Sequence, residues 1–297
     1  MSSIPKKILV ATDFSATADT AEKIAYQLAS LLEAELDLVH VRVILEDPLM
    51  AEEQQMEIER MMASTDEATR QAFARDRTGD RGITVRTHLI RSVSAAEAIT
   101  ATASDLDSDL IVMGTHGRRG IKHMLLGSVA ENVIRSVDLP VLTVRPDTAF
   151  PAHGPKRILV AHDFSDRSAG AIRVAGDWAR AFDADVTLLH VVEPVVYPEF
   201  YAINALTDDV ITRLQDRASE ALDDAAMETL PDLRVTTRVC VGRAIKTIVA
   251  EARPESFDLV VMGTRGLTGL EQLMLGSVAE GVLRRCPVPL LTVSCES

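Results

Sequence analysis

The sequence predicts an α/β fold made of two Rossmann-like, doubly wound domains in tandem. One observation is an internal repeat: the segment 8–15 returns at 158–165, and the segment 126–131 returns at 275–280. The other is that short β-branched runs alternate with longer stretches of helical period in both copies. This alternation is typical of a parallel sheet, here of five strands per copy, whose two faces are covered by helices.

The first copy is expected to contain five strands and four helices. Each strand is a short apolar run rich in Val and Ile, and in each helix apolar residues recur every three or four positions. Ser94 and Glu97 have capping-box spacing, which marks the start of the third helix. The strands are expected at 7–12, 36–43, 84–90, 110–113 and 141–144, and the helices at about 17–32, 50–76, 94–104 and 128–137.

The second copy repeats this order after a proline-containing segment. Residues 145–155 carry three prolines, which is typical of an extended linker. We therefore expect a first domain at 1–146, a linker at 147–155 and a second domain at 156–297. Its strands are expected at 157–161, 186–192, 234–240, 259–262 and 290–293, and its helices at about 168–182, 208–229, 244–253 and 277–285.

Composition narrows the class of protein. The 297 residues are 47% hydrophobic and carry a formal net charge of −13, which argues against a nucleic-acid-binding surface. No apolar stretch approaches the roughly 18 residues of a membrane span, so we expect a soluble, cytoplasmic protein with no membrane partner. The three cysteines lack the spacing of a metal site, and no metal site formed by protein side chains is expected.

Ligands of open parallel sheets bind beyond the carboxyl ends of the strands, and both repeated motifs lie there. Strand one ends at Asp13 or Asp163, carboxylates that could accept hydrogen bonds from a ribose diol. Strand four leads into a loop with glycines at both ends, and the loop finishes at a helix start. Glycines let the backbone approach phosphate oxygens, and helix-start amides favour anions. The loop residues are Gly114, Gly117, Gly127 and Ser128 in the first copy, and Gly263, Gly266, Gly276 and Ser277 in the second.

With these residues the chain resembles the tandem universal stress proteins of the ATP-binding kind. The phosphate motif of that family is glycine, two residues, glycine, nine residues, glycine and serine or threonine, and both copies satisfy it. The resemblance implies the strand order 3-2-1-4-5 in each domain. It also implies that ATP, with Mg²⁺, is the ligand.

The resemblance further implies a role for each matching residue. Asp13 and Asp163 would hold the ribose, and the backbone at Val41 and Val191 would face the adenine. The loop and the start of the following helix would hold the phosphates. That phosphate set comprises Gly114, His116, Gly117, Gly127, Ser128 and Val129 in the first copy, and Gly263, Arg265, Gly266, Gly276, Ser277 and Val278 in the second.

The two loops differ in charge. His116 in the first copy is followed by Arg118, Arg119 and Lys122, whereas Arg265 in the second is followed by mainly uncharged residues. We therefore expect the first site to bind a triphosphate more tightly. In addition, His162 replaces Thr12 just before the aspartate, where its larger ring would crowd the base or stack on it.

Two of these features have simpler interpretations. Ser128 with Glu131, and Ser277 with Glu280, also fit a capping box, in which the serine and glutamate only satisfy helix-end amides. His40 lies in an apolar strand, as does His190, and both are expected to be packed or bonded to the backbone rather than to bind metal.

Other nucleotide-binding classes fit the sequence less well. A dinucleotide-dependent dehydrogenase would have GxGxxG after strand one, and a Walker-type NTPase would have GxxxxGK[ST], and neither pattern is present. The first hypothesis is therefore a nucleotide-binding stress or signalling module with at most slow ATP hydrolysis. The alternative is an enzyme of the same α/β superfamily that activates a substrate by adenylation.

The fifth strand of each copy, 141–144 and 290–293, is entirely apolar apart from a threonine. In the implied strand order each is a sheet edge, and an exposed apolar edge favours pairing. We expect the two to pair within one chain, giving a pseudo-twofold arrangement. Further association into a homodimer of chains is left open by the sequence.

Overall fold

The computed structural model describes residues 4–44, 83, 85–115, 126–146, 148–193, 208–264 and 275–294. The described residues of the first domain form five strands and three helices. In chain order they are β1 (Lys7–Ala11), α1 (Ala16–Leu32), β2 (Glu35–Val43), β3 (Val85–Ser92), α3 (Ala95–Asp105), β4 (Leu110–Gly114), α4 (Ser128–Ser136) and β5 (Val141–Val144). The helix expected at 50–76 lies outside the described residues.

The second domain repeats this sequence of elements and adds a described second helix. The elements are β6 (Arg157–Ala161), α5 (Asp166–Phe182), β7 (Asp185–Val192), α6 (Asp208–Thr229), β8 (Val235–Val241), α7 (Ala244–Glu251), β9 (Leu259–Gly263), α8 (Ser277–Leu283) and β10 (Leu290–Val293). Every predicted element among the described residues is present, with ends shifted by at most two residues. Helix α5 begins two residues earlier than predicted because the Ser165 hydroxyl accepts from the Ser168 amide and caps its start.

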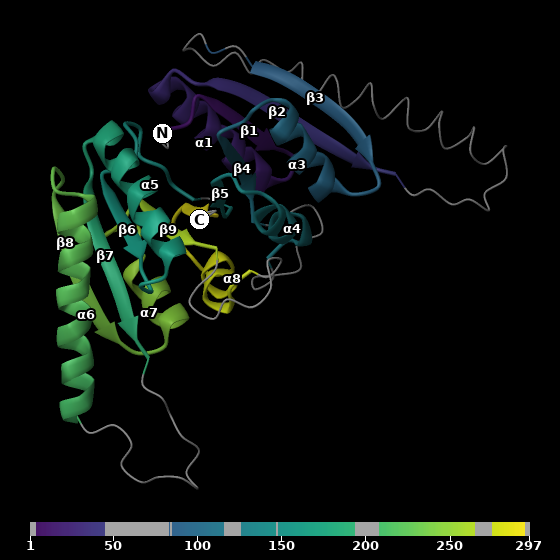
Figure 1. Cartoon of the computed structure of the whole chain (residues 1–297). Coiled ribbons are helices and arrows are strands. Elements are labelled where there is room, and N and C mark those ends of the chain that lie inside the picture. The colour runs from purple at the N-terminus through teal and green to yellow at the C-terminus, as the bar shows by residue number, and fades with distance from the viewer. Residues whose placement is uncertain are drawn as a thin grey trace, which may run out of the picture.

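All ten strands form one sheet in the order β3-β2-β1-β4-β5-β10-β9-β6-β7-β8. Neighbours within each domain are parallel, and each half has the order that the resemblance implied. The two halves join where β5 and β10 pair antiparallel, with Leu142 opposite Leu291. The fifth strands therefore pair within the chain as expected, and the two domains are related by a pseudo-twofold arrangement (Figure 1).

The helices cover both faces of this sheet. The face that we call the α1 face carries α1, α5 and α6, whose residues Leu28, Trp178 and Leu222 pack with alternate strand residues in one buried cluster. The opposite α4 face carries α3, α4, α7 and α8, which pack against the other strand residues. A period of two along each strand explains this division, because successive side chains point to opposite faces.

The segment between the domains contacts both of them. The Gln27 side chain of α1 donates a hydrogen bond to the Pro151 carbonyl, and Phe150 packs against the α1-face core. Gly154 has φ +79, and a Cβ there would overlap the ring of Phe182 in α5. Only glycine fits this contact without displacing the ring.

In the described part of the chain, no helix has the length and apolar character of a membrane span.

Candidate functional site

Strands β1 and β6 end in the same tight turn. Asp13 Oδ1 accepts a hydrogen bond from the Ser15 amide at 3.0 Å, and Asp163 Oδ1 accepts from the Ser165 amide at 3.1 Å. The residue between them, Phe14 or Phe164, has φ near +60, in the left-handed region that bulky residues rarely adopt. The turn holds each aspartate at the carboxyl end of its strand, beside β4 or β9.

The second aspartate has additional hydroxyl contacts. The Ser165 hydroxyl donates to Asp163 Oδ1 at 2.6 Å, and the Ser168 hydroxyl lies beside the same turn. Burial by itself would raise the pKa of Asp163, but the hydrogen bonds from Ser165 and Ser168 outweigh it and hold that pKa below its ordinary value. Asp163 is therefore an ionised acceptor at neutral pH.

The histidines of the second strands are bonded to the backbone, as the sequence predicted. Nδ1 of His40 lies 2.7 Å from the Thr12 carbonyl, and Nδ1 of His190 lies 2.8 Å from the His162 carbonyl. Because a carbonyl only accepts, Nδ1 carries the proton in both rings. The next residues, Val41 and Val191, are partly buried and pack against the α4-face core.

The glycine loops are closed at their base by backbone hydrogen bonds. The Gly127 amide donates to the Thr115 carbonyl at 2.7 Å, and the Gly276 amide donates to the Thr264 carbonyl at 2.9 Å. Gly114 is required by packing, since a Cβ there would lie 2.7 Å from Cγ2 of Thr17 in α1. The loop residues His116, Gly117, Arg265 and Gly266 lie outside the described residues.

The structure contradicts the capping-box interpretation in both copies. The N-cap of α4 is Gly127, which has no side chain to cap with, and the exposed Ser128 is already the first helical residue. The Glu131 carboxylate pairs with Arg135 one turn further on, and Glu280 pairs with Arg284 in the same way. A capping box requires serine at the N-cap and a glutamate that turns back toward it.

The start of α4 therefore has amides without a partner in the part of the chain that the structure describes. Among the described residues no side chain caps this helix, and the Ser128 and Val129 amides have no backbone acceptor. Free amides and the helix dipole together favour an anion. At the start of α8, which has only seven residues, the Ser277 and Val278 amides likewise have no backbone acceptor among the described residues.

At the position of Thr12 the second domain has a buried histidine. Thr12 Oγ1 accepts from the Phe14 amide at 3.1 Å, whereas the His162 ring lies edge-on to Phe164 with centroids 5.0 Å apart. Burial lowers the pKa of His162, and its Nδ1 has no hydrogen-bond partner among the described residues. The ring thus contacts Phe164 and is neutral at pH 7.

The residues that shape these turns were not among the predicted site residues. Phe14 with Ser15, and Phe164 with Ser165, were overlooked, although the repetition of Asp-Phe-Ser after both first strands is a visible signal.

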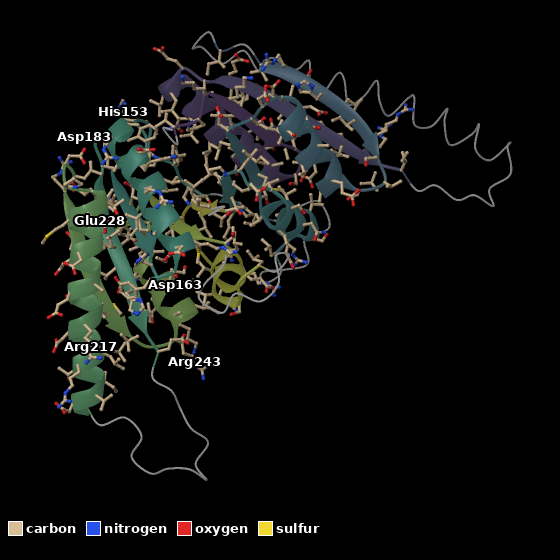
Figure 2. The ribbon with its side chains drawn as sticks, in the orientation of Figure 1. His153, Asp163, Asp183, Arg217, Glu228 and Arg243 are labelled. Atoms are coloured by element: carbon tan, nitrogen blue, oxygen red, sulfur yellow. The ribbon has the colours of Figure 1, made fainter. Side chains whose placement is uncertain are left out.

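Figure 2 shows Asp163, Arg217 and Arg243 toward one end of the second domain, where β7 ends, with Asp183 and Glu228 toward the other.

Comparison with known proteins agrees with the fold. The universal stress protein family matches residues 5–145 and 154–294. A universal stress protein of Mycolicibacterium smegmatis is 27% identical over 96% of both chains, and one of Thermus aquaticus is 34% identical over 46% of this chain and 98% of its own. The crystal structure of a universal stress protein from Archaeoglobus fulgidus has a TM-score of 0.68 at 20% identity, covering 97% of this chain and 98% of its own. The chain belongs to the universal stress protein family.

Proposed function

We propose that the chain binds ATP, with Mg²⁺, at the carboxyl end of the first domain's sheet, and that it acts in the cytoplasm as a nucleotide-binding stress-response or signalling module. The observation that carries this proposal is the uncapped start of α4, where Gly127 leaves the amides of Ser128 and Val129 without a partner among the described residues. An anionic group such as a phosphate is the ligand that such a helix start favours.

The remaining residues of the first site supply the rest of the nucleotide contacts. Gly114, His116 and Gly117 would line the phosphates together with the Ser128 hydroxyl. The Val41 backbone would face the adenine and Asp13 the ribose, since both lie at the carboxyl ends of strands that neighbour each other in the sheet. Mg²⁺ would neutralise phosphate charge when bound.

The second site is proposed to bind the same nucleotide more weakly. Helix α8 is shorter than α4, and the second loop lacks counterparts of Arg118, Arg119 and Lys122 in the first. Fewer basic side chains give a polyphosphate less electrostatic attraction. This second site would be formed by Asp163, Val191, Gly263, Arg265, Gly266, Gly276, Ser277 and Val278.

The direct test is to release and identify the ligand of freshly purified protein by mass spectrometry, and then to titrate ligand-free protein with ATP and MgCl₂ by calorimetry. Bound ATP at a 100-fold excess over Kd should stabilise the fold by about 2.7 kcal/mol, visible as a higher Tm. A ligand-free chain that shows neither heat of binding nor a Tm shift at millimolar ATP would contradict the proposal. Release of AMP and pyrophosphate would favour the adenylating enzyme instead.

A further inference from the structure

The second domain contains a hollow between β7 and α6, and of its lining residues the nucleotide proposal includes only Val191. Its volume is about 390 Å³, within the range of small-molecule sites. Phe164 and His190 line it from the strand ends, which we call its floor, and Leu214, Ala218 and Ala221 line it from α6, which we call its wall. Arg217 of α6 also lines it and is exposed, and we call this position its rim. We propose that this hollow binds a flat, apolar small molecule that carries a carboxylate.

The hollow lies on the opposite face of the sheet from the start of α8. Helix α6 packs on the α1 face through Leu222, whereas α8 packs on the α4 face through Val282. Val191 also lines the hollow, but it packs against the α4-face core. The β-sheet therefore separates this hollow from the proposed phosphate site, and the inference does not depend on nucleotide binding.

The floor is suited to a flat ring. Phe164 is held in the left-handed conformation with 38% of its surface exposed, and its ring packs against His190 with centroids 4.5 Å apart. An exposed aromatic face on a packed support offers offset stacking to another flat ring. Because Nδ1 of His190 donates to the His162 carbonyl, Nε2 is an acceptor on the same floor.

The wall provides space and apolar surface. Leu214, Ala218 and Ala221 are spaced on one face of α6, and the two alanines leave room where a larger side chain would fill the hollow. Leu214 is 40% exposed, an unusual exposure for a leucine that faces a concave surface. An apolar ligand would remove both Leu214 and Phe164 from water.

The charges at the rim select an anion. Arg217 forms no ion pair or hydrogen bond with any described residue, in contrast to Arg213, which pairs with Asp209 at 2.7 Å one turn earlier. The Glu193 carboxylate is engaged by the Ala244 amide at the start of α7. Among the described residues that line the hollow, the charged group without a hydrogen-bond or ion-pair partner is thus the Arg217 guanidinium, and a guanidinium binds carboxylates with two parallel hydrogen bonds.

The test uses 2-naphthoate as the probe and its neutral analogue 2-naphthalenemethanol as the ligand control, titrated into the full chain by calorimetry. We expect saturable 1:1 binding of the naphthoate, tighter than that of the alcohol. Arg217→Gln should weaken naphthoate binding about fivefold, because an exposed ion pair contributes little, and should leave the alcohol unchanged. Arg213→Gln is the matched control and should bind both probes as wild type does.

Ala221→Leu tests the position of the probe without removing a charge. Ala221 is exposed, so the variant should fold as wild type does, and its larger side chain should weaken both probes. Saturating ATP with MgCl₂ should leave naphthoate affinity unchanged. No saturable binding to folded wild type, equal naphthoate affinity in Arg217→Gln and Arg213→Gln, or displacement by ATP would each overturn the proposal.

Discussion

Thr143 and Thr292 join the two domains through reciprocal hydrogen bonds. Thr143 Oγ1 donates to the Leu290 carbonyl at 3.2 Å, and Thr292 Oγ1 donates to the Val141 carbonyl at the same distance. Both threonines are at most 2% exposed. The seam between β5 and β10 therefore has two buried hydroxyl contacts beside its backbone ladder and its apolar side chains.

Replacement of either threonine by valine should weaken this seam. Valine keeps the β-branched shape but cannot donate, so Thr143→Val and Thr292→Val should each lower the free energy of unfolding by about 1 kcal/mol. Urea denaturation monitored by circular dichroism measures the change. Thr20→Val is a suitable control, because its hydroxyl bonds to the Ala16 carbonyl at the exposed start of α1. If the seam variants lose no more stability than this control, the two hydroxyls do not hold the domains together.

A second prediction concerns Asp37, which is 1% exposed in β2 and accepts hydrogen bonds from Arg86 and His88 of the edge strand β3. Burial alone would raise the pKa of Asp37, but these hydrogen bonds outweigh it and keep that pKa below its ordinary value. A lowered folded-state pKa gives stability that is present above pH 4 and lost as the pH falls through the folded value.

Asp37→Asn should therefore lower the free energy of unfolding by about 1.5–3 kcal/mol at pH 7, and the difference from wild type should shrink below pH 4. Denaturant titrations at pH 7, 5 and 3 measure it. Glu35→Gln removes the exposed carboxylate of the same cluster and should change stability by less than about 1 kcal/mol at any of these values. A constant difference between Asp37→Asn and wild type across the range would argue against the ionised pair.

The cluster around Asp37 shows why part of the structure could not be predicted from the sequence. The strands could be predicted, because an apolar run such as 141–144 or 290–293 is visible in the sequence whatever strand it pairs with in the fold. Asp37 and Arg86 are 49 residues apart, and only the register of β2 against β3 makes them neighbours. At the matching register of the second domain Thr187 lies opposite Thr236, so the repeat does not reveal the pair either.

The candidate site was predicted in part for a similar reason. The carboxyl-end positions of Asp13 and Asp163 follow from strand patterns alone. The first residue of α4 could not be predicted in this way. The segment 127–131 fits a helix with Ser128 as the N-cap of a capping box, and it fits equally a helix with Gly127 as the N-cap. Arg135, one turn after Glu131, forms an ion pair with the Glu131 carboxylate and so draws it away from the helix start. A capping-box rule considers only the residues of the first turn, so it does not include Arg135.

A third prediction concerns His162, whose buried ring leaves Nδ1 without a partner among the described residues. Burial lowers the pKa of His162, so protonation below pH 6.5 favours the unfolded chain. His162→Thr, which restores the residue found at Thr12, should remove this dependence. Between pH 7 and pH 5 wild type should lose up to about 2 kcal/mol relative to the variant, the limit for a group with an unfolded pKa of 6.5.

Urea denaturation at both pH values measures this difference. His153→Thr, at an exposed position between the domains, controls for the loss of a histidine as such. Parallel stability curves for wild type and His162→Thr would mean that the buried ring is not the source of the acid sensitivity.

The last prediction concerns Ser128, the first residue of α4. Because Gly127 is the N-cap and Ser128 makes no capping bond, Ser128→Ala should change the free energy of unfolding by less than about 0.5 kcal/mol. Ser94→Ala is the matched control for a true cap, since the Ser94 hydroxyl accepts from the Glu97 amide at 3.3 Å, and its loss should cost about 1 kcal/mol.

The nucleotide affinity of Ser128→Ala, unlike its stability, should change strongly. If the Ser128 hydroxyl binds a phosphate, Ser128→Ala should weaken ATP by about tenfold to a hundredfold, because a hydrogen bond to a charged group contributes roughly 1.5–3 kcal/mol. Adenosine lacks phosphates and should bind Ser128→Ala and wild type equally. Ser277→Ala should show a smaller loss, because the first loop carries Arg118, Arg119 and Lys122. Calorimetry with ATP and adenosine on the three proteins measures this, and equal ATP affinity in wild type and Ser128→Ala would show that the hydroxyl binds no phosphate.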